Sequence, residues 1–166
     1  RMIRLMSNLL EMARLQSNEI VLKKEWIPAS ELIGMSKNNL KDRLDKFNVF
    51  VEIDEDCPMF YRDPVLLDRV LTNLLDNAIE AAKQCDIGKR IVKIKMLYED
   101  AVLSIAVSNS YKAEPVLTED GYIRTTKKDR EEHGWGMRNV VATLEKYNAE
   151  YIIDYKNGEF VFSIIM

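Results

Sequence analysis

The 166-residue chain is long enough for one domain, or for one domain with an extension. Apolar residues make up 47% and charged residues 31%, a composition that excludes intrinsic disorder. Its 24 basic and 27 acidic residues leave a net charge of -3, which is too balanced for a nucleic-acid-binding surface. The sequence has no apolar run of the about 18 residues that a membrane span needs, no signal-peptide pattern and no metal-type cysteine spacing. We therefore expect a soluble, cytoplasmic piece of a longer protein.

Residues 1–17 carry an apolar stripe at helical spacing, without a helix start signal before it. Its members recur at steps of three and four, widened by neighbours on either side: Met2, Leu5, Leu9 and Met12, with Met6, Leu10, Ala13 and Leu15. A stripe this wide predicts packing against a partner helix, in a dimer or in a helical hairpin. An ordinary helix packed on its own domain is the alternative.

The next part of the chain predicts a helix, a strand and a longer helix. Ser30 is a candidate cap for a helix that runs to about Lys46, and residues 48–53 alternate like a strand. Asp63 followed by Pro64 combines an N-cap residue with proline at the first helical position. The helix that follows, to about residue 84, is predicted to bury Leu67, Val70, Leu71, Leu74, Ala78 and Ile79.

The second half predicts four strands, a long loop and one helix. Residues 91–97 and 102–107 alternate like strands, residues 109–134 show little periodicity, and Gly136 opens a helix. Strands at 150–155 and 159–165 close the chain around an Asn-Gly pair at residues 157–158, the signal of a type I′ hairpin. This order predicts an α+β fold, a two-layer sandwich with helices on one face of a mixed sheet.

One helix face carries residues that a helix does not need. Steps of three and four place Asn73, Asp76, Asn77 and Glu80 on one side, although asparagine is a weak helix former. An amide oxygen is a good magnesium ligand, and Mg²⁺ binds few protein oxygens together with phosphates and water. A solvated polar face is the alternative reading of this pattern.

Two further segments flank the long loop. Residues 107–111, VSNSY, end a strand in small polar side chains, which fits a pocket or a plain turn. Residues 133–137, HGWGM, join the loop to the last helix, where glycines and free backbone N–H groups form a candidate anion site. Basic residues lie nearby in sequence, although a glycine-capped helix start is a common alternative: Lys127, Lys128, Arg130 and Arg138.

Taken in this order, these segments resemble the ATP-binding catalytic domain of sensor histidine kinases, the Bergerat or GHKL fold shared with gyrase, Hsp90 and MutL. NLLDNAIEA (73–81) resembles the N box and HGWGMRN (133–139) the second glycine box. SNSYK (108–112) and RTTKKDREEHGWGMRNV (124–140) are similar to peptide-quorum-sensing kinases, whereas residues 4–26 are similar to potassium-responsive KdpD kinases. The resemblance implies the end of a dimerisation and phosphotransfer helix with its linker at 1–28, and the catalytic domain at 29–166.

The resemblance also implies roles for individual residues. Asn73 and Asn77 are the implied catalytic and ATP-binding N-box positions, and Asn77 is the implied magnesium ligand. Asn109 stands where most of the family has an aspartate that accepts a hydrogen bond from adenine, and Tyr111 replaces a glycine, so weaker adenine binding is expected. Residues 112–132 are the implied lid. The remaining implied ATP-binding positions are Thr126, Lys127, Gly134, Gly136 and Met137.

The implied activity is that of a protein-histidine kinase, which transfers the γ-phosphoryl group of ATP to a histidine with the help of Mg²⁺. His133 lacks the helical setting of a phosphoacceptor, so this piece is expected to bind ATP without autophosphorylating. The implied partners are the chain's own dimerisation domain, in a homodimer, and a response regulator. The phosphoprotein to which the piece belongs is expected to be membrane-anchored.

Three other functions fit the same fold. An ATP-hydrolysing clamp of the gyrase or Hsp90 kind needs a glutamate as general base at the first N-box position, where this chain has Asn73. A serine kinase of the anti-sigma type is distinguished by its N-terminal part, which here resembles a dimerisation stalk. A docking or dimerisation domain that binds nucleotide poorly is favoured by the altered segment at residues 109–111.

Overall fold

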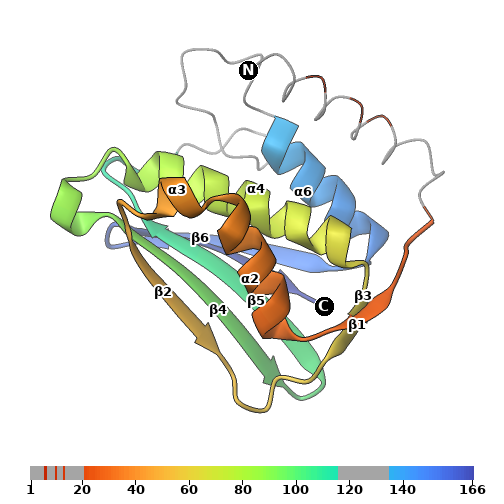
Figure 1. Ribbon diagram of the computed structural model, residues 1–166. Coiled ribbons are helices and arrows are strands. Elements are labelled where there is room, and N and C mark those ends of the chain that lie inside the picture. Colours follow the sequence, from red (N-terminus) through yellow and green to blue (C-terminus); the bar gives the residue numbers. More distant parts are fainter. Residues whose placement is uncertain (1–5, 7–9, 11–12, 14–20, 116–134) are drawn as a thin grey trace.

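The computed structural model describes residues 21–115 and 135–166, together with Met6, Leu10 and Ala13 (Figure 1). Met6 and Leu10 lie in helical conformation and are 56% and 60% exposed. The rest of the predicted N-terminal stripe lies outside the described residues. No helix in the described part is long and apolar enough to cross a membrane.

A mixed five-stranded sheet forms one layer of the molecule (Figure 1). Its strand order is β2-β4-β5-β7-β6, with a parallel pair between β2 and β4 and antiparallel pairs elsewhere. Strands β1 (Glu25–Ile27) and β3 (Phe60–Arg62) form a separate antiparallel pair. The five strands of the main sheet are β2 (Asn48–Ile53), β4 (Ile91–Glu99), β5 (Val102–Ser110), β6 (Glu150–Lys156) and β7 (Glu159–Ile165).

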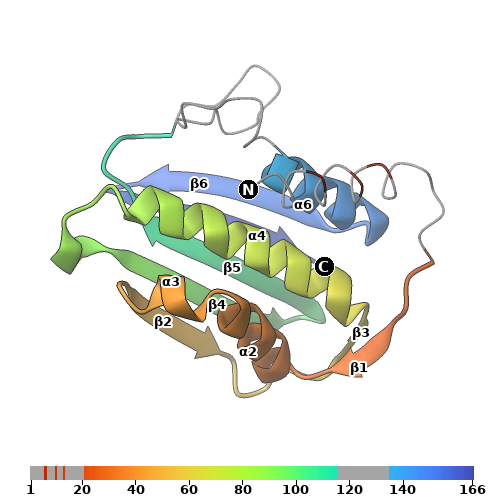
Figure 2. The ribbon, with the colours of Figure 1, turned by 45° about the horizontal axis from the view of Figure 1, so that its top comes forward.

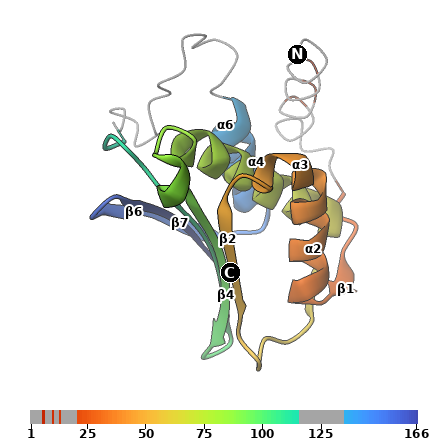
Figure 3. The ribbon, with the colours of Figure 1, turned by 60° about the vertical axis from the view of Figure 1, so that its left-hand side comes forward.

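The helices form the second layer, on one face of this sheet (Figure 3). The long helix α4 lies between α2 and α3 on one flank and α6 on the other (Figure 2). The predicted two-layer α+β architecture is therefore confirmed. The helix bounds are α2 (Ala29–Asn39), α3 (Lys41–Leu44), α4 (Pro64–Ala82) and α6 (Trp135–Lys146), with a 3₁₀ turn at Ile87–Lys89.

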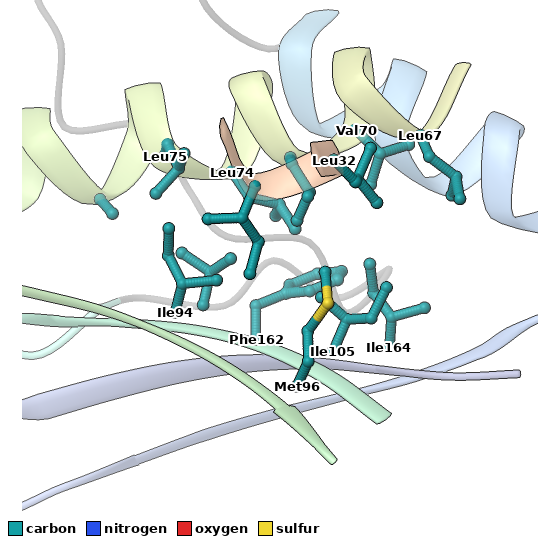
Figure 4. Packing of buried hydrophobic residues seen from close by; sticks show 14 of the residues in the cluster. Leu32, Leu67, Val70, Leu74, Leu75, Ile94, Met96, Ile105, Phe162 and Ile164 are labelled. Atoms are coloured by element: carbon teal, nitrogen blue, oxygen red, sulfur yellow. The ribbon is translucent and has the colours of Figure 1, made fainter. Parts of the chain in front are cut away.

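The hydrophobic core lies between α4 and the sheet (Figure 4). Leu74 and Leu75 of α4 face Ile94 and Met96 of β4 and Phe162 of β7, and all five side chains are at most 3% exposed. Burying one such side chain contributes about 1.5–3 kcal/mol, so this contact fixes α4 firmly on the sheet. Every residue that the periodicity placed on the inner side of α4 is buried: Leu67, Val70, Leu71, Leu74, Ala78 and Ile79.

Two start and turn signals of the sequence are confirmed. The Asp63 side chain accepts hydrogen bonds of 3.1 Å from the backbone N–H groups of Val65 and Leu66, so it caps α4 as expected. Asn157 and Gly158 both have positive φ, 54° and 82°, as a type I′ hairpin between β6 and β7 requires.

The prediction of one helix, capped by Ser30 and running to about Lys46, is wrong in its cap and in its continuity. The helix α2 begins directly after Pro28, whose carbonyl accepts hydrogen bonds from the N–H groups of Glu31 and Leu32, so Ser30 is not the cap. It breaks at Leu40, where φ is −119° and ψ is 13°. Leaving the helical angles there keeps the Leu40 side chain in the core and turns α3 towards α4.

Candidate functional site

Gly136, at the start of α6, lies next to the helix that carries Asn73, since α4 and α6 pack side by side (Figure 2). A Cβ atom placed on Gly136 would lie 3.7 Å from Oδ1 of Asn73. Gly136 does not need glycine for its backbone angles, because among the described glycines only Gly158 has positive φ. The lack of a side chain at Gly136 leaves space beside Asn73.

The start of α6 offers backbone donors at the same place. The first N–H groups of an α-helix have no intrahelical acceptor, and the positive end of the helix dipole lies there. Met137 is half-buried and packs against the core, so it brings its backbone rather than its side chain to this turn. The combination of a glycine and a helix start suits the oxygen atoms of a phosphate.

Asn77 lies one turn after Asn73 along α4, and both side chains are half-buried. Their neighbours Leu74, Leu75 and Ala78 are buried, so the core holds the helix while the two amides stay at its rim. The described residues contain no group of three or more His, Cys, Asp or Glu side chains that could hold a metal ion. A single amide oxygen suits Mg²⁺ only when phosphate oxygens and water supply the other ligands of the cation. The predicted role of Asn77 is of this kind.

Asp76, between the two asparagines, is buried and forms an ion pair with Arg43 of α3. The other guanidinium nitrogen of Arg43, Nη2, lies 2.5 Å from Oε1 of Glu80. The sequence analysis did not identify Arg43, because no spacing rule relates a residue of α3 to one of α4. An ion-paired Asp76 is not a free general base, which disfavours the ATP-hydrolysing alternative.

Asn109 is 4% exposed and lies inside β5, which runs three residues beyond its predicted end at residue 107. Its Nδ2 donates a 2.9 Å hydrogen bond to the carbonyl of Ser110, which fixes the amide orientation. The acceptor Oδ1 is then the atom that suits an amino group of a ligand. Its register partners are Val92 of β4 and Phe160 of β7, so the amide sits among apolar neighbours.

The serines around Asn109 hold the end of β5 in place. Ser108 Oγ and Lys93 Nζ both donate 2.8 Å hydrogen bonds to Oε1 of Glu159, and the Lys93 bond is the main cause of a lowered Glu159 pKa. Ser110 Oγ accepts a 3.0 Å hydrogen bond from the N–H group of Ile91. The polar segment is therefore an ordered strand end rather than a plain turn.

Some of the predicted site residues are not among those that the structure describes. Thr126, Lys127 and Gly134 lie outside the described residues, as does His133 and most of the predicted lid. Tyr111 is described: it is half-buried, and its N–H group donates a 2.9 Å hydrogen bond to the carbonyl of Gly158. The structure thus places Gly136 beside Asn73, with Asn77 one turn away along α4.

Comparison with known proteins gives matches in sequence and in fold. A family model described as a GHKL domain matches residues 62–166. Sensor protein KdpD of Escherichia coli (strain K12) is 40% identical over 86 residues, which are 51% of this chain and 10% of KdpD. The chain therefore spans a small part of that relative's length.

Solved structures extend the likeness to nearly the whole chain. Full-length ShkA in complex with AMPPNP has a TM-score of 0.77 at 17% identity, over 98% of this chain and 35% of ShkA. Histidine kinase ThkA in complex with response regulator protein TrrA has a TM-score of 0.73 at 19% identity, over 99% of this chain and 47% of ThkA. At such identities the likeness establishes the fold.

Proposed function

Because this chain belongs to the GHKL family and is a catalytic domain of the sensor histidine kinase type, we propose that it binds Mg-ATP at the junction of α4 and α6 and donates the γ-phosphoryl group to a histidine. The family and the fold class expected from the sequence are confirmed, as is the likeness to KdpD. The likeness of the C-terminal half to peptide-quorum-sensing kinases stays a prediction. So does the division of the chain at residue 28.

The position of Gly136 beside Asn73 carries this proposal. It joins two motifs from distant parts of the sequence and leaves room for a ligand atom where a side chain would otherwise stand. A phosphate group at this point would meet the backbone N–H groups at the start of α6. Full-length ShkA was solved with AMPPNP, an ATP analogue, which supports a nucleotide as the ligand of this fold.

Asn77 is the residue that we expect to hold Mg²⁺, with Asn73 beside it. Asn77 would hold the cation through its amide oxygen, and the positive charge supplied there would offset charge on the phosphates. The protein's own part is to position the triphosphate. In the transfer, a bond forms between a histidine ring nitrogen and the γ-phosphorus atom, while the bond to the β–γ bridging oxygen breaks and ADP leaves.

Asn109 is the residue that we expect to recognise adenine, because its Oδ1 can accept a hydrogen bond from the amino group. A neutral bond of this kind contributes about 0.5–1.5 kcal/mol, less than a carboxylate would. Replacing Asn109 by leucine should abolish the preference for adenine over guanine nucleotides in a competition titration. Asn109→Asp should keep or strengthen it, and an unchanged preference in Asn109→Leu would remove this residue from the base site.

The phosphoryl acceptor and the response regulator are proposed as separate partners. ThkA was solved with response regulator protein TrrA, which supports a regulator as the second partner. We also expect the parent protein to be a membrane-anchored homodimer whose catalytic domain works in the cytoplasm.

Transfer to an added acceptor tests the proposed reaction. The chain is mixed with a dimerisation domain of a KdpD-type kinase and with ATP labelled on the γ-phosphate, and acid-labile label should appear on that domain. The same domain with its histidine replaced should stay unlabelled. Nucleotide binding without any label on the acceptor would contradict the transfer. Absence of both would favour the docking-domain alternative, which binds nucleotide poorly.

A further inference from the structure

The polar face of α4 carries two acidic side chains beside its two asparagines. With about 100° of rotation per residue, Asp76, Glu80, Asn73 and Asn77 lie within an arc of about 100° around the helix axis. Two carboxylates so close to a triphosphate would repel it. The repulsion is stronger at a partly buried site than in water, because the effective dielectric constant is lower there.

Arg43 lies against both carboxylates. Its Nη1 pairs with Oδ1 of Asp76, and its Nη2 lies 2.5 Å from Oε1 of Glu80. Asp76 has 7% of its side chain exposed, whereas Arg43 and Glu80 have about a third exposed, 34% and 35%. A buried carboxylate is strongly unfavourable without positive charge beside it, and the guanidinium of Arg43 supplies such charge to Asp76.

Joining α2 to α4 does not require this arginine. Asp68 of α4 already accepts hydrogen bonds from Ser36 Oγ at 2.8 Å and from Asn39 Nδ2 at 2.9 Å, both on α2. The Arg43 pair lies two to three turns further along α4, on the turns that carry Asn73 and Asn77. Its location matches the nucleotide site rather than the α2 contact.

We propose that Arg43 is a positioning residue for the triphosphate, which acts by neutralising and orienting the acidic flank of the Asn73 and Asn77 face. The inference rests on the proposed function, because it assumes that the phosphates lie at this face. Arg43 reaches them through Asp76 and Glu80. Its chemistry is electrostatic, so its influence should follow the charge of the ligand.

The first test compares a charged and an uncharged ligand. Arg43→Ala should weaken binding of a non-hydrolysable ATP analogue with Mg²⁺ about tenfold, a factor typical of one charge interaction at intermediate dielectric. Binding of adenosine, followed by nuclear magnetic resonance, should change by less than about twofold, because adenosine carries no phosphate. Equal loss for both ligands would indicate a structural role and overturn the proposal.

The second test restores the charge balance without the arginine. The triple variant Arg43→Ala, Asp76→Asn, Glu80→Gln removes the two carboxylates, so affinity for the ATP analogue should return to within about threefold of the parent chain. Arg43→Lys keeps the charge but loses the two-pronged guanidinium, so its affinity should lie between those of Arg43→Ala and the parent chain. If Arg43→Ala does not fold, the triple variant and Arg43→Lys still test whether Arg43 acts through its charge. If the triple variant folds but binds the ATP analogue at least tenfold more weakly than the parent chain, the proposal is overturned.

A matched control removes one positive charge elsewhere. Lys95 pairs with Glu52 at 2.7 Å on the other face of the sheet, so Lys95→Ala should leave affinity for the analogue within about twofold. An equal loss in Lys95→Ala would show that only net charge matters and would contradict a local role of Arg43. If the parent chain binds no ATP analogue, the proposed function fails. If the parent binds and Arg43→Ala binds equally well, this inference alone fails.

Discussion

The two flanks of α4 hold this helix by different means. Towards α2 and α3, its contacts include polar bonds between side chains: Asp68 with Ser36 and Asn39, and Arg43 with the acidic pair. Towards α6, the backbone of Gly136 approaches Asn73 with no side chain of its own between them. The first flank fixes α4 in orientation, and the second leaves room for a ligand beside it. Loss of the Asp68 bonds on the first flank should therefore lower stability, whereas a change at Gly136 on the second should lower nucleotide affinity.

The largest effect is expected at Asn77, on the ligand side of the comparison. Asn77→Ala should weaken magnesium-dependent binding of an ATP analogue by about 3 kcal/mol, or more than about a hundredfold in Kd, because it removes the oxygen that we propose as the Mg²⁺ ligand. The fold should persist, since alanine favours helices and Asn77 is only half-buried. Calorimetric titration measures the loss.

The exposed asparagine Asn38 on α2 provides the control for this substitution. Asn38→Ala makes the same chemical change in a helix on the other flank and should leave the affinity unchanged. Binding of Mg-ATP by Asn77→Ala as tightly as by the parent chain would refute the N-box assignment.

The next effect is expected on stability, at Asp68. Asp68→Ala removes the acceptor of the Ser36 and Asn39 bonds and should lower the free energy of unfolding by about 2 kcal/mol, since hydrogen bonds to charged groups are among the stronger ones. Urea unfolding measures this, with Asp68→Asn as the milder change. Nucleotide affinity should stay within about twofold of the parent. A large loss of affinity without loss of stability would mean that the two flanks are not separable.

Gly136→Ala should produce the reverse result. An added methyl group would stand at ordinary contact distance from Asn73 Oδ1, and alanine favours helices, so the variant should unfold at the same or a higher temperature. Affinity for the ATP analogue should fall about tenfold, because the methyl group would occupy the space in which we propose a phosphate oxygen. Gly88→Ala, in the 3₁₀ turn far from α6, is the control. Unchanged affinity in Gly136→Ala would move the phosphate away from α6.

The smallest effect concerns a bond that joins the end of α6 to the start of α4. Tyr147 OH donates a 3.2 Å hydrogen bond to the carbonyl of Asp63, and burial, followed by the charge of Asp63, raises the pKa of Tyr147 to about 12. Because this pKa exceeds the unfolded value of about 10, the stabilisation is complete below pH 10 and is lost as the pH rises towards 12.

Tyr147→Phe removes the titrating group and should flatten that dependence. The difference in unfolding free energy between the parent and Tyr147→Phe should therefore shrink between pH 9 and pH 12, as measured by urea unfolding in matched buffers. The change in this difference with pH should be modest, because Tyr147 is half-buried. A difference that stays constant between pH 9 and pH 12 would show that folding does not raise the pKa of Tyr147.

Short sequence patterns predicted the features that depend on neighbouring residues alone: the buried side of a helix, a helix start and a hairpin turn. The apolar spacing placed the buried side of α4 correctly, Asp63 with Pro64 marked its start, and the Asn-Gly pair marked the last hairpin. The order of elements was sufficient for the fold class. The site residues followed from motif resemblance, and the structure places two of them, Asn73 and Gly136, next to each other.

The features that the sequence did not predict depend on contacts between distant residues. The break at Leu40 follows from how α2 and α3 fit onto α4, and the short strands β1 and β3 are too brief for a period-two signal. The extension of β5 through Asn109 depends on pairing with β4 and β7. The ion pairs of Arg43 join residues more than thirty positions apart, for which no local rule exists.

Calorimetric titration of this chain with a non-hydrolysable ATP analogue, with and without Mg²⁺, tests the central claim most directly. The arrangement of Asn73, Asn77 and the start of α6 predicts micromolar to sub-millimolar binding that requires Mg²⁺, on the order of 4–8 kcal/mol. Absence of binding up to millimolar nucleotide, in a chain shown to be folded, would contradict the nucleotide site and favour a docking domain on the same fold.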